Sequence, residues 1–368
     1  MLKKIGHEVL FLNAKKGNAR NGEGDFYRLD DGRIMFAFTE YIGDDGDDHA
    51  HAQISAVFSD DEGDSWYGRR TLFPMDEGSM NNMCVSFLKM ENGEIGLFYG
   101  QKYRDAENNI CMRVRLRRSS DNAVTWTEPI NCTSDGYYFV FENARVIRHS
   151  SGRIIIPVNC HNINDSAKAG EGVTWYFYSD DDGSTFYDSG HRIRNPFDDG
   201  AAYGLQETGV IEMENGRLFS FSRTGFATQF ESFSDDVGKT WSTPAPSLLF
   251  TSPASPMHVR HLSNGKTVAV WNPIPKFPGR RSEKGIEEWS RRTPLIAFAC
   301  QGKGEEFWTD RSKWNMAYLL EDDDKNAYCY SAVFGGEDYF LCAYYHSNNT
   351  KSCLNSCKIT KVYYSEME

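Results

Sequence analysis

Short runs of alternating apolar and polar residues, separated by turns rich in Gly, Asn, Asp and Ser, extend along nearly the whole chain. Residues 205–223 are one example, and their alternation predicts two strands around the turn Asn215-Gly216, because Asn-Gly is the strongest short-range hairpin signal. The two outer ends of a hairpin lie together, so Glu207 and Arg223 are expected side by side. A carboxylate beside a guanidinium, away from the turn, indicates a candidate site.

A second turn pattern, Ser-x-Asp-x-Gly-x-Ser/Thr-aromatic, repeats along the chain. Four copies occupy residues 59–66, 119–126, 179–186 and 234–241, and a degenerate fifth copy occupies residues 300–307. Ala123 replaces the Gly in the second copy. The Asp can accept hydrogen bonds from turn amides and Gly permits positive φ, so we expect these turns to be structural and not catalytic.

These turns alternate with short turns that follow apolar strands, at Asp31-Gly32, Asn92-Gly93, Ser151-Gly152, Asn215-Gly216, Asn264-Gly265 and Gly335-Gly336. Six units of two hairpins predict an all-β fold, a six-bladed β-propeller with four-stranded antiparallel blades, in a single domain of residues 1–368. Residues 8–12 precede the first unit. We expect them to supply the outer strand of the last blade and to close the ring.

The four Ser/Asp turns resemble the Asp-box, or BNR, repeat of the sialidase (neuraminidase) superfamily. The resemblance covers nearly the whole chain and implies the propeller fold. It bears less directly on activity, because Asp-box propellers also occur as lyases, other glycosidases and binding domains. In this topology, the starts of the first strands and the loops between strands two and three share one face, so site residues are expected there.

The resemblance implies a Tyr nucleophile, a Glu that takes its proton and an Asp acid/base. Tyr330 and Glu207 match the first two, and Tyr328 is an alternative nucleophile by one strand register. The acid/base falls in the acidic run at residues 44–48, and its favoured members are Asp48 and Asp47. Neighbouring carboxylates raise one another's pKa, so a protonated Asp is expected in this loop. The alternative interpretation of this acidic run is a solvated loop or a Ca²⁺ site.

The family's three arginines bind the substrate carboxylate by paired hydrogen bonds. Arg223 and Arg292 resemble the second and third, with Arg291 as an alternative to Arg292. The first normally lies in an Arg-Ile-Pro motif, which is missing here; Arg20 lies twelve residues before Gly32 instead, and residues 23–25 (Glu-Gly-Asp) take the strand start. Either Arg20 reaches the site through a shifted loop or the substrate differs. Two further substrate-binding candidates on this face are Arg145 and His258.

The resemblance therefore implies a retaining exo-glycosidase that releases a terminal acidic sugar, with sialic acid as the leading case. A neutral Tyr suits a reacting carbon that carries a carboxylate, because a carboxylate nucleophile would be repelled. Two alternatives stay open: a propeller glycosidase or lyase for a uronic-acid or deoxy-sugar glycan, and a non-catalytic glycan-binding propeller. The expected partner is an acidic glycan or sialoside, no cofactor is required, and the oligomeric state stays open.

Composition limits the kinds of partner and the cellular compartment that we expect for this protein. The net charge of −12 argues against nucleic acid, which needs clustered Lys and Arg. No apolar run is long enough for a signal core or a membrane span, so we expect a cytoplasmic, bacterial protein. The nine cysteines are scattered and odd in number, and we expect them reduced and buried. Metal binding is not expected; the weaker candidates are the pair Cys353 and Cys357, and the histidines His49, His51, His161 and His258.

Overall fold

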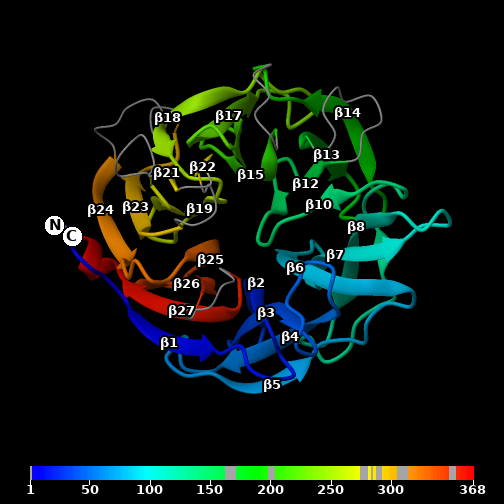
Figure 1. Cartoon of the computed structure of the whole chain (residues 1–368), viewed down its shortest axis with the longest axis horizontal. Coiled ribbons are helices and arrows are strands. Elements are labelled where there is room, and N and C mark those ends of the chain that lie inside the picture. Colours follow the sequence, from blue (N-terminus) through cyan, green and yellow to red (C-terminus); the bar gives the residue numbers. More distant parts are fainter. Residues whose placement is uncertain are drawn as a thin grey trace.

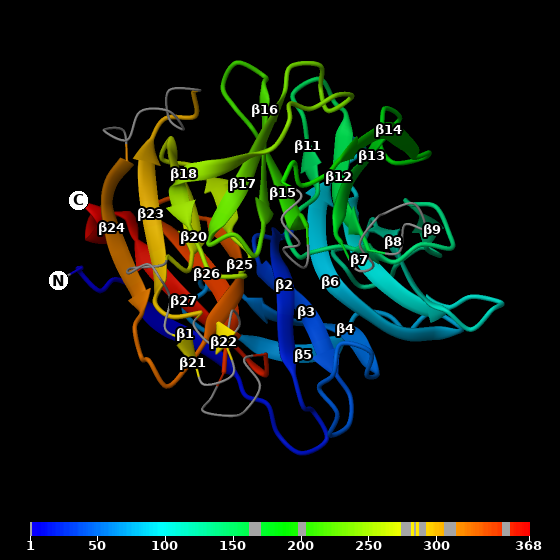
Figure 2. The same ribbon diagram turned by 45° about the horizontal axis from the view of Figure 1, so that its top comes forward.

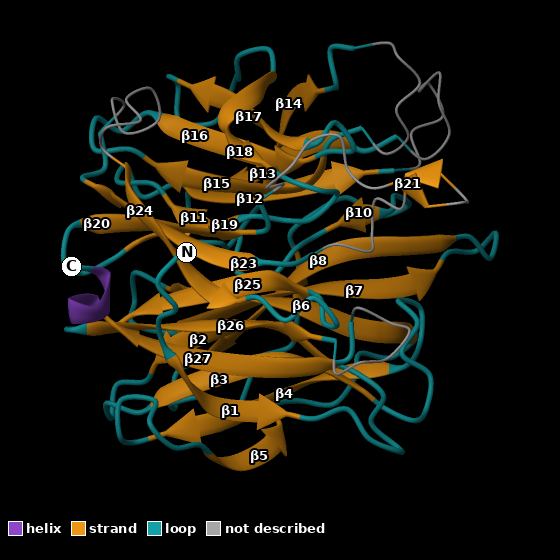
Figure 3. Cartoon of the chain, turned by 60° about the vertical axis from the view of Figure 1, so that its left-hand side comes forward, coloured by secondary structure: helices purple, strands orange, loops and turns teal. Residues whose placement is uncertain are grey.

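The computed structural model describes residues 2–161, 171–197, 204–273, 281–282, 285–286, 292–304, 314–347 and 354–368. Six antiparallel sheets in this part of the chain surround a central axis in chain order (Figure 1). Strands dominate the molecule, and a short 3-10 helix, Tyr364–Met367, lies near the C-terminus (Figure 3). The prediction of an all-β, six-bladed propeller is confirmed.

The strands of each blade follow one another from the axis outward. Blade one contains β2 (Asn21–Arg28), β3 (Ile34–Tyr41), β4 (Ala52–Ser59) and β5 (Tyr67–Thr71). Blade two contains β6 (Ser79–Lys89), β7 (Ile95–Arg104), β8 (Ile110–Ser119) and β9 (Ile130–Asn131). Blade three contains β10 (Phe139–Val140), β11 (Ile147–Arg148), β12 (Ile154–Cys160), β13 (Val173–Ser179) and β14 (Tyr187–Ile193), with β10 and β11 both paired to β12.

Blade four contains β15 (Gln206–Glu212), β16 (Leu218–Arg223), β17 (Thr228–Ser234) and β18 (Ala245–Thr251). Blade five contains β19 (His258–His261), β20 (Lys266–Trp271), β23 (Leu295–Gln301) and β24 (Trp314–Glu321). A two-stranded sheet, β21 (Arg281–Ser282) with β22 (Gly285–Ile286), lies between β20 and β23 in sequence. Blade six contains β25 (Tyr328–Gly335), β26 (Tyr339–His346), β27 (Ser356–Tyr363) and β1 (His7–Leu12).

The N-terminal strand closes the ring as predicted. β1 pairs antiparallel with β27 as the outer strand of blade six, with His7 opposite Lys361 and Leu12 opposite Cys357. The two termini therefore lie close together (Figure 1). Closure by a strand from the opposite end of the chain ties the last blade to the first, and β1 is the outer edge strand of blade six.

The hydrophobic core is divided among the six interfaces between neighbouring blades. Phe98 of blade two, for example, belongs to one cluster with Ile156 and Phe177 of blade three. Tyr344 of blade six belongs to another with Val270 of blade five. Full burial of such side chains stabilises the fold by about 1.5–3 kcal/mol each. Each sheet is therefore apolar on both faces, which is what radial packing requires.

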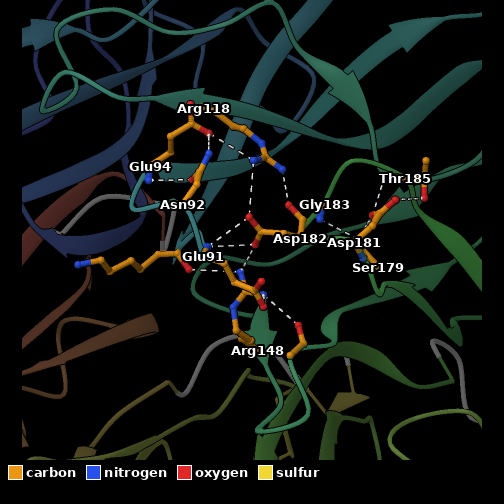
Figure 4. A network of polar contacts seen from close by, with 12 residues as sticks. Glu91, Asn92, Glu94, Arg118, Arg148, Ser179, Asp181, Asp182, Gly183 and Thr185 are labelled. Atoms are coloured by element: carbon orange, nitrogen blue, oxygen red, sulfur yellow. Dashed lines mark hydrogen bonds and ion pairs between the residues drawn. The ribbon is translucent and has the colours of Figure 1, made fainter.

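The four Asp boxes share one set of hydrogen bonds, and the box of blade three shows it (Figure 4). The Ser179 hydroxyl donates to Asp181 Oδ1 at 2.7 Å and accepts from the Gly183 amide at 2.7 Å. Asp181 also accepts from the Thr185 amide at 2.9 Å and from the Thr185 hydroxyl at 2.6 Å. These bonds lower the pKa of Asp181 to about 2, first through the Thr185 hydroxyl. The structural role expected for the repeat is confirmed.

Each Asp box also contacts the preceding blade. Asp182 accepts from the Glu91 amide, in the first turn of blade two, at 3.2 Å and pairs with Arg148 of blade three at 2.5 Å (Figure 4). Asn122 accepts from the Asp30 amide of blade one in the same way, at 3.0 Å. The boxes therefore join adjacent blades on the face that carries the first turns. The degenerate fifth copy extends into residues 305–307, which lie outside the described residues.

Bulges in the innermost strands direct side chains toward the axis. In or next to the innermost strands, the non-Gly residues at positive φ are Glu23, Cys84, Ala144, Glu207 and Tyr330, in blades one, two, three, four and six. In β2, β6, β15 and β25 the pairing register shifts at this position. A bulge turns a side chain out of the sheet's alternation, and a positive φ costs a non-Gly residue about 1–3 kcal/mol. Figure 2 shows the first strands of the blades, such as β2, β15 and β25, close to the centre of the ring.

Candidate active site

Tyr330, Glu207 and Arg223 form a directly bonded group at the axis. The Tyr330 hydroxyl donates to Glu207 Oε1 at 2.6 Å, and Arg223 Nη1 donates to the same oxygen at 2.6 Å. Arg223 Nη1 also lies 3.4 Å from the Tyr330 hydroxyl. Glu207 and Arg223 face each other because β15 and β16 form one hairpin, as the sequence predicted. Tyr330 comes from blade six, 123 residues further along the chain.

The electrostatics of this group keep Glu207 ionised and Tyr330 neutral. Burial opposes ionisation of Glu207, but the charge of Arg223 and the hydrogen bonds from Arg223 and Tyr330 prevail, so the pKa of Glu207 is lowered. Burial and then the nearby charge of Glu207 raise the pKa of Tyr330 well above its usual value. A neutral phenol that donates to an ionised carboxylate is the arrangement needed for proton removal during nucleophilic attack.

Arg292 lies against the ring of Tyr330. Its guanidinium carbon is 5.3 Å from the ring centroid, and the side chain is 2% exposed. It donates to Cys329 Sγ at 3.0 Å and to the Ala254 carbonyl at 3.2 Å. Arg292 therefore reaches the group as expected, whereas its alternative, Arg291, lies outside the described residues.

Arg145 and His258 reach the same place from blades three and five. The Arg145 side chain is 3% exposed and packs over the ring of Phe221, with 5.3 Å from its guanidinium carbon to the ring centroid. Burial, and then Arg145 and Arg260, lower the pKa of His258 well below its usual value, so this imidazole is neutral. Both candidates border the group without bonding to Glu207 or Tyr330.

Glu142 is a buried acid beside the group that sequence reasoning did not select. Burial raises its pKa well above the usual range, and the charges of Glu207 and Glu23 add to the effect. Its Oε1 accepts from the Asn143 amide at 2.8 Å. The signal that could have found it is its place in Phe141-Glu-Asn-Ala-Arg145, at the axial start of blade three.

Arg20 lies at the axial end of blade one, in a second group with Glu23 and Asp48. It donates to Tyr345 at 2.7 Å through Nε, to Asp48 Oδ1 at 2.5 Å through Nη1 and to Glu23 Oε1 at 2.5 Å through Nη2. The ring of Tyr345 is perpendicular to that of Tyr330, with 5.8 Å between centroids, so the two groups adjoin. Arg20 therefore lies next to the Tyr330 group and has its donors directed at protein acceptors.

Asp48 and Asp47 differ sharply, although they are adjacent in the acidic loop. The Asp48 side chain is 59% exposed and bonds to Arg20, while Asp47 is exposed and accepts from the His49 amide within a turn. Lys102 Nζ and Asn81 Nδ2 hold the loop by donating to the Asp48 carbonyl at 2.6 and 3.0 Å. Only Asp48 of the two is directed to the site.

The expectation that neighbouring carboxylates raise the pKa of Asp48 is wrong. Desolvation raises its pKa, but the charges of Arg20 and Lys102 outweigh this effect and lower it. The cations that decide the result come from other parts of the fold, whereas the nearby acidic side chains of the loop point elsewhere. Asp44, for example, accepts from the Gly17 amide at 2.6 Å.

A cavity of about 770 Å³ opens beside Asp48 on the same face. Its wall includes Lys15, Lys16, Arg20, Asp48 and Asn355. Tyr330 and Glu207 do not line it; the cavity borders Arg20 and Asp48 instead. The volume falls within the usual range for sites that hold small organic ligands.

The other sequence alternatives find less support in the described residues. The ring of Tyr328 packs on Tyr344 and His346, away from Glu207. In the described part of the chain, no group of three or more His, Cys, Asp or Glu side chains has an arrangement that could hold a metal ion. Eight cysteines are described, and all are buried and unpaired as disulfides; Cys353 lies outside the described residues. Within the same ranges, no helix has the length and apolar character needed to cross a membrane.

Comparison with known proteins supports the repeat assignment. Residues 32–343 match the family model described as a BNR repeat-like domain. The chain belongs to this family. A curated relative, a sialidase of Paraclostridium sordellii, is 23% identical over 231 residues, which are 58% of this chain and 55% of the relative. The chain thus spans about half the length of that relative. The resemblance to the sialidase superfamily is confirmed for the repeat and the fold.

Solved structures show the same fold at low sequence identity. A Dyadobacter fermentans protein of unknown function has a TM-score of 0.72 at 16% identity, covering 97% of this chain and 99% of its own. The leech intramolecular trans-sialidase, complexed with 2,7-anhydro-Neu5Ac, has a TM-score of 0.71 at 13% identity, covering 98% and 70%. The intramolecular trans-sialidase of Ruminococcus gnavus has a TM-score of 0.68 at 13% identity, covering 97% of each chain.

Proposed function

We propose that the protein is a sialidase-like retaining exo-glycosidase that releases a terminal acidic sugar, with sialic acid as the leading substrate. The observation that carries the proposal is the 2.6 Å hydrogen bond from the Tyr330 hydroxyl to Glu207, flanked by Arg223. Tyr330 is partly exposed, so a substrate can approach its hydroxyl. The curated sialidase relative supports the same reaction class, and the solved trans-sialidases share the fold.

The first step forms a bond between Tyr330 Oη and the anomeric carbon and breaks the bond from that carbon to the leaving oxygen. Glu207 takes the phenolic proton, and Asp48, after it takes up a proton from solvent against its lowered pKa, gives that proton to the leaving oxygen. In the second step water attacks the anomeric carbon, Asp48 takes a proton from the water, and the departing phenolate regains its proton from Glu207. The sugar leaves with retained configuration, and atoms and charges balance.

The cationic side chains fit a sugar that carries a carboxylate on the reacting carbon. Arg223 and Arg292 both adjoin Tyr330, and guanidinium groups bind carboxylates by paired hydrogen bonds. The cavity beside Asp48 suits the leaving group, because the acid that protonates the departing oxygen must lie next to the aglycone. His258, neutral and buried beside this site, is assigned to packing against the bound sugar.

The test is hydrolysis of the fluorogenic substrate 4-methylumbelliferyl N-acetylneuraminide. The wild-type protein should release the fluorophore, and Tyr330→Phe should not. Product configuration, followed by proton NMR during turnover, should show retention. Release of the inverted sugar would contradict a covalent Tyr330 intermediate.

One observation favours a second candidate, a glycosidase or lyase for a uronic-acid or deoxy-sugar glycan. Arg20, the only arginine from blade one near the axis among the described residues, bonds to Glu23 and Asp48. The blade-one arginine of the family's pattern therefore has protein carboxylates as its acceptors here. A panel of acidic oligosaccharides distinguishes the two: cleavage of uronides and not sialosides selects the second. Binding without any product, unchanged in Tyr330→Phe, selects a non-catalytic propeller.

A further inference from the structure

The donors of Arg20 are already used by the protein. Its Nε donates to Tyr345, its Nη2 donates to Glu23, and its Nη1 donates to Asp48 and to the Gly46 carbonyl at 3.3 Å. The side chain is 2% exposed. An arginine has five N–H donors, so few remain for a ligand. A substrate carboxylate at Arg20 would have to displace two carboxylates that are already bound.

Arg145 has the opposite surroundings. Although it is buried, no hydrogen bond or ion pair joins its guanidinium to any part of the chain that the structure describes, and Nε is enclosed without an acceptor. Apolar packing fixes its place: Phe221 lies beneath it, and a Cβ on Gly209 would approach Nη1 to 2.8 Å. Burial lowers the pKa of Arg145 although the nearby Glu142 and Glu207 oppose this effect, and a bound anion that accepts its hydrogen bonds would relieve the cost of burial.

Three arginines from consecutive blades thus surround the nucleophile. Arg145 belongs to blade three, Arg223 to blade four and Arg292 precedes β23 of blade five. Against the three positive charges of this arc, Glu207 supplies one negative charge and Glu142 at most one more, because burial raises the pKa of Glu142 well above its usual range. The arc therefore has a net positive charge beside Tyr330, which suits an anionic ligand.

From these observations, we propose that Arg145, and not Arg20, is the third arginine that binds the substrate carboxylate, together with Arg223 and Arg292. The inference rests on the proposed function and changes its specificity: the carboxylate is held on the side of blades three to five. Arg20 instead serves as a positioning residue that orients Asp48. A sugar whose carboxylate is esterified should then bind without the ionic contribution of Arg145.

The test compares a sialoside with its methyl ester in matched variants, Arg145→Gln and Arg20→Gln. The wild-type protein should favour the acid, and Arg145→Gln should reduce the acid-to-ester ratio of kcat/KM by about 10- to 100-fold. Arg20→Gln should keep the wild-type ratio, whatever its effect on the rate. The ratio is insensitive to the fraction of folded enzyme. An unchanged ratio in Arg145→Gln, or a ratio lost in Arg20→Gln, overturns the assignment.

A binding experiment tests the role of Arg145 independently of the proposed hydrolysis. Free N-acetylneuraminic acid and galacturonic acid, with their methyl esters, are titrated into wild-type, Arg145→Gln and Arg20→Gln proteins and followed by ligand-observed NMR. Acid-selective binding that Arg145→Gln alone abolishes upholds the assignment even if no sialoside is hydrolysed, and only the proposed reaction then fails. If neither free acid binds the wild type, the assignment falls.

Discussion

Replacement of Tyr330 by Phe should abolish activity at little cost to the fold. The change removes one oxygen, which donates a 2.6 Å hydrogen bond to Glu207. The ring stays, and with it the contacts to Tyr345 and Arg292. Glu207 Oε1 also keeps its bond from Arg223, so no charge is left without a partner.

The magnitudes follow from this geometry. A hydrogen bond to a charged group contributes about 1.5–3 kcal/mol to stability. Because Glu207 keeps its hydrogen bond from Arg223, the variant should lose only about 1 kcal/mol of unfolding free energy. Such a loss lowers the Tm of a chain this long by at most a few degrees, about 2–4 °C. In contrast, loss of the nucleophile should lower kcat/KM by at least about 10³-fold, or about 4 kcal/mol in activation free energy.

The assay measures initial rates with the fluorogenic sialoside and Tm by differential scanning calorimetry on the same samples. Tyr328→Phe is the matched control, because it makes the same change two residues earlier in β25, where the ring packs on Tyr344 and His346. It should keep wild-type kcat/KM. Activity of Tyr330→Phe within about tenfold of wild type would refute the role of Tyr330 as the nucleophile. Loss of activity in both variants would show that the effect is not specific to Tyr330.

Three further results are expected. Glu207→Gln should lower the free energy of unfolding in urea by about 3–5 kcal/mol, because it leaves buried Arg223 without its carboxylate. Since the fold lowers the pKa of Glu207, the ionised carboxylate stabilises the wild-type protein above the usual pKa of Glu, and this stabilisation is lost as the pH falls below that value. The variant should lack this acid-dependent loss of stability. Arg20→Gln should raise the pKa of Asp48 and move the alkaline limb of the kcat/KM–pH profile to higher pH, whereas Arg28→Gln, on the opposite face, should not; an unmoved limb would exclude Asp48 as the acid. Asp181→Ala should cost about 2–3 kcal/mol in the same urea measurement through three lost hydrogen bonds, and Asp180→Ala, which removes only an exposed ion pair with Arg153, at most about 1 kcal/mol; equal costs would contradict the structural role of the box.

The sequence by itself determined the architecture of this protein. The regular Asp boxes, the Gly turns between them and the alternation of apolar residues are local signals, and local hydrogen bonds, as in Asp181, produce the turns they predict. The strand order and the closure of the ring were predictable from the six repeated units of two hairpins. The neighbourhood of Glu207 and Arg223 was also predictable, because one hairpin holds both residues.

The tertiary structure alone decided which distant side chains meet. Glu23, Glu142 and the choice of Asp48 over Asp47 depend on bulges and loop contacts that join separate blades, and no local pattern encodes them. The pKa of Asp48 shows the reason: its sequence neighbours are acids, but its spatial neighbours Arg20 and Lys102 are cations, and electrostatic interactions depend on distance in space. For the same reason, only the fold distinguishes the bonded Arg20 from the unbonded Arg145.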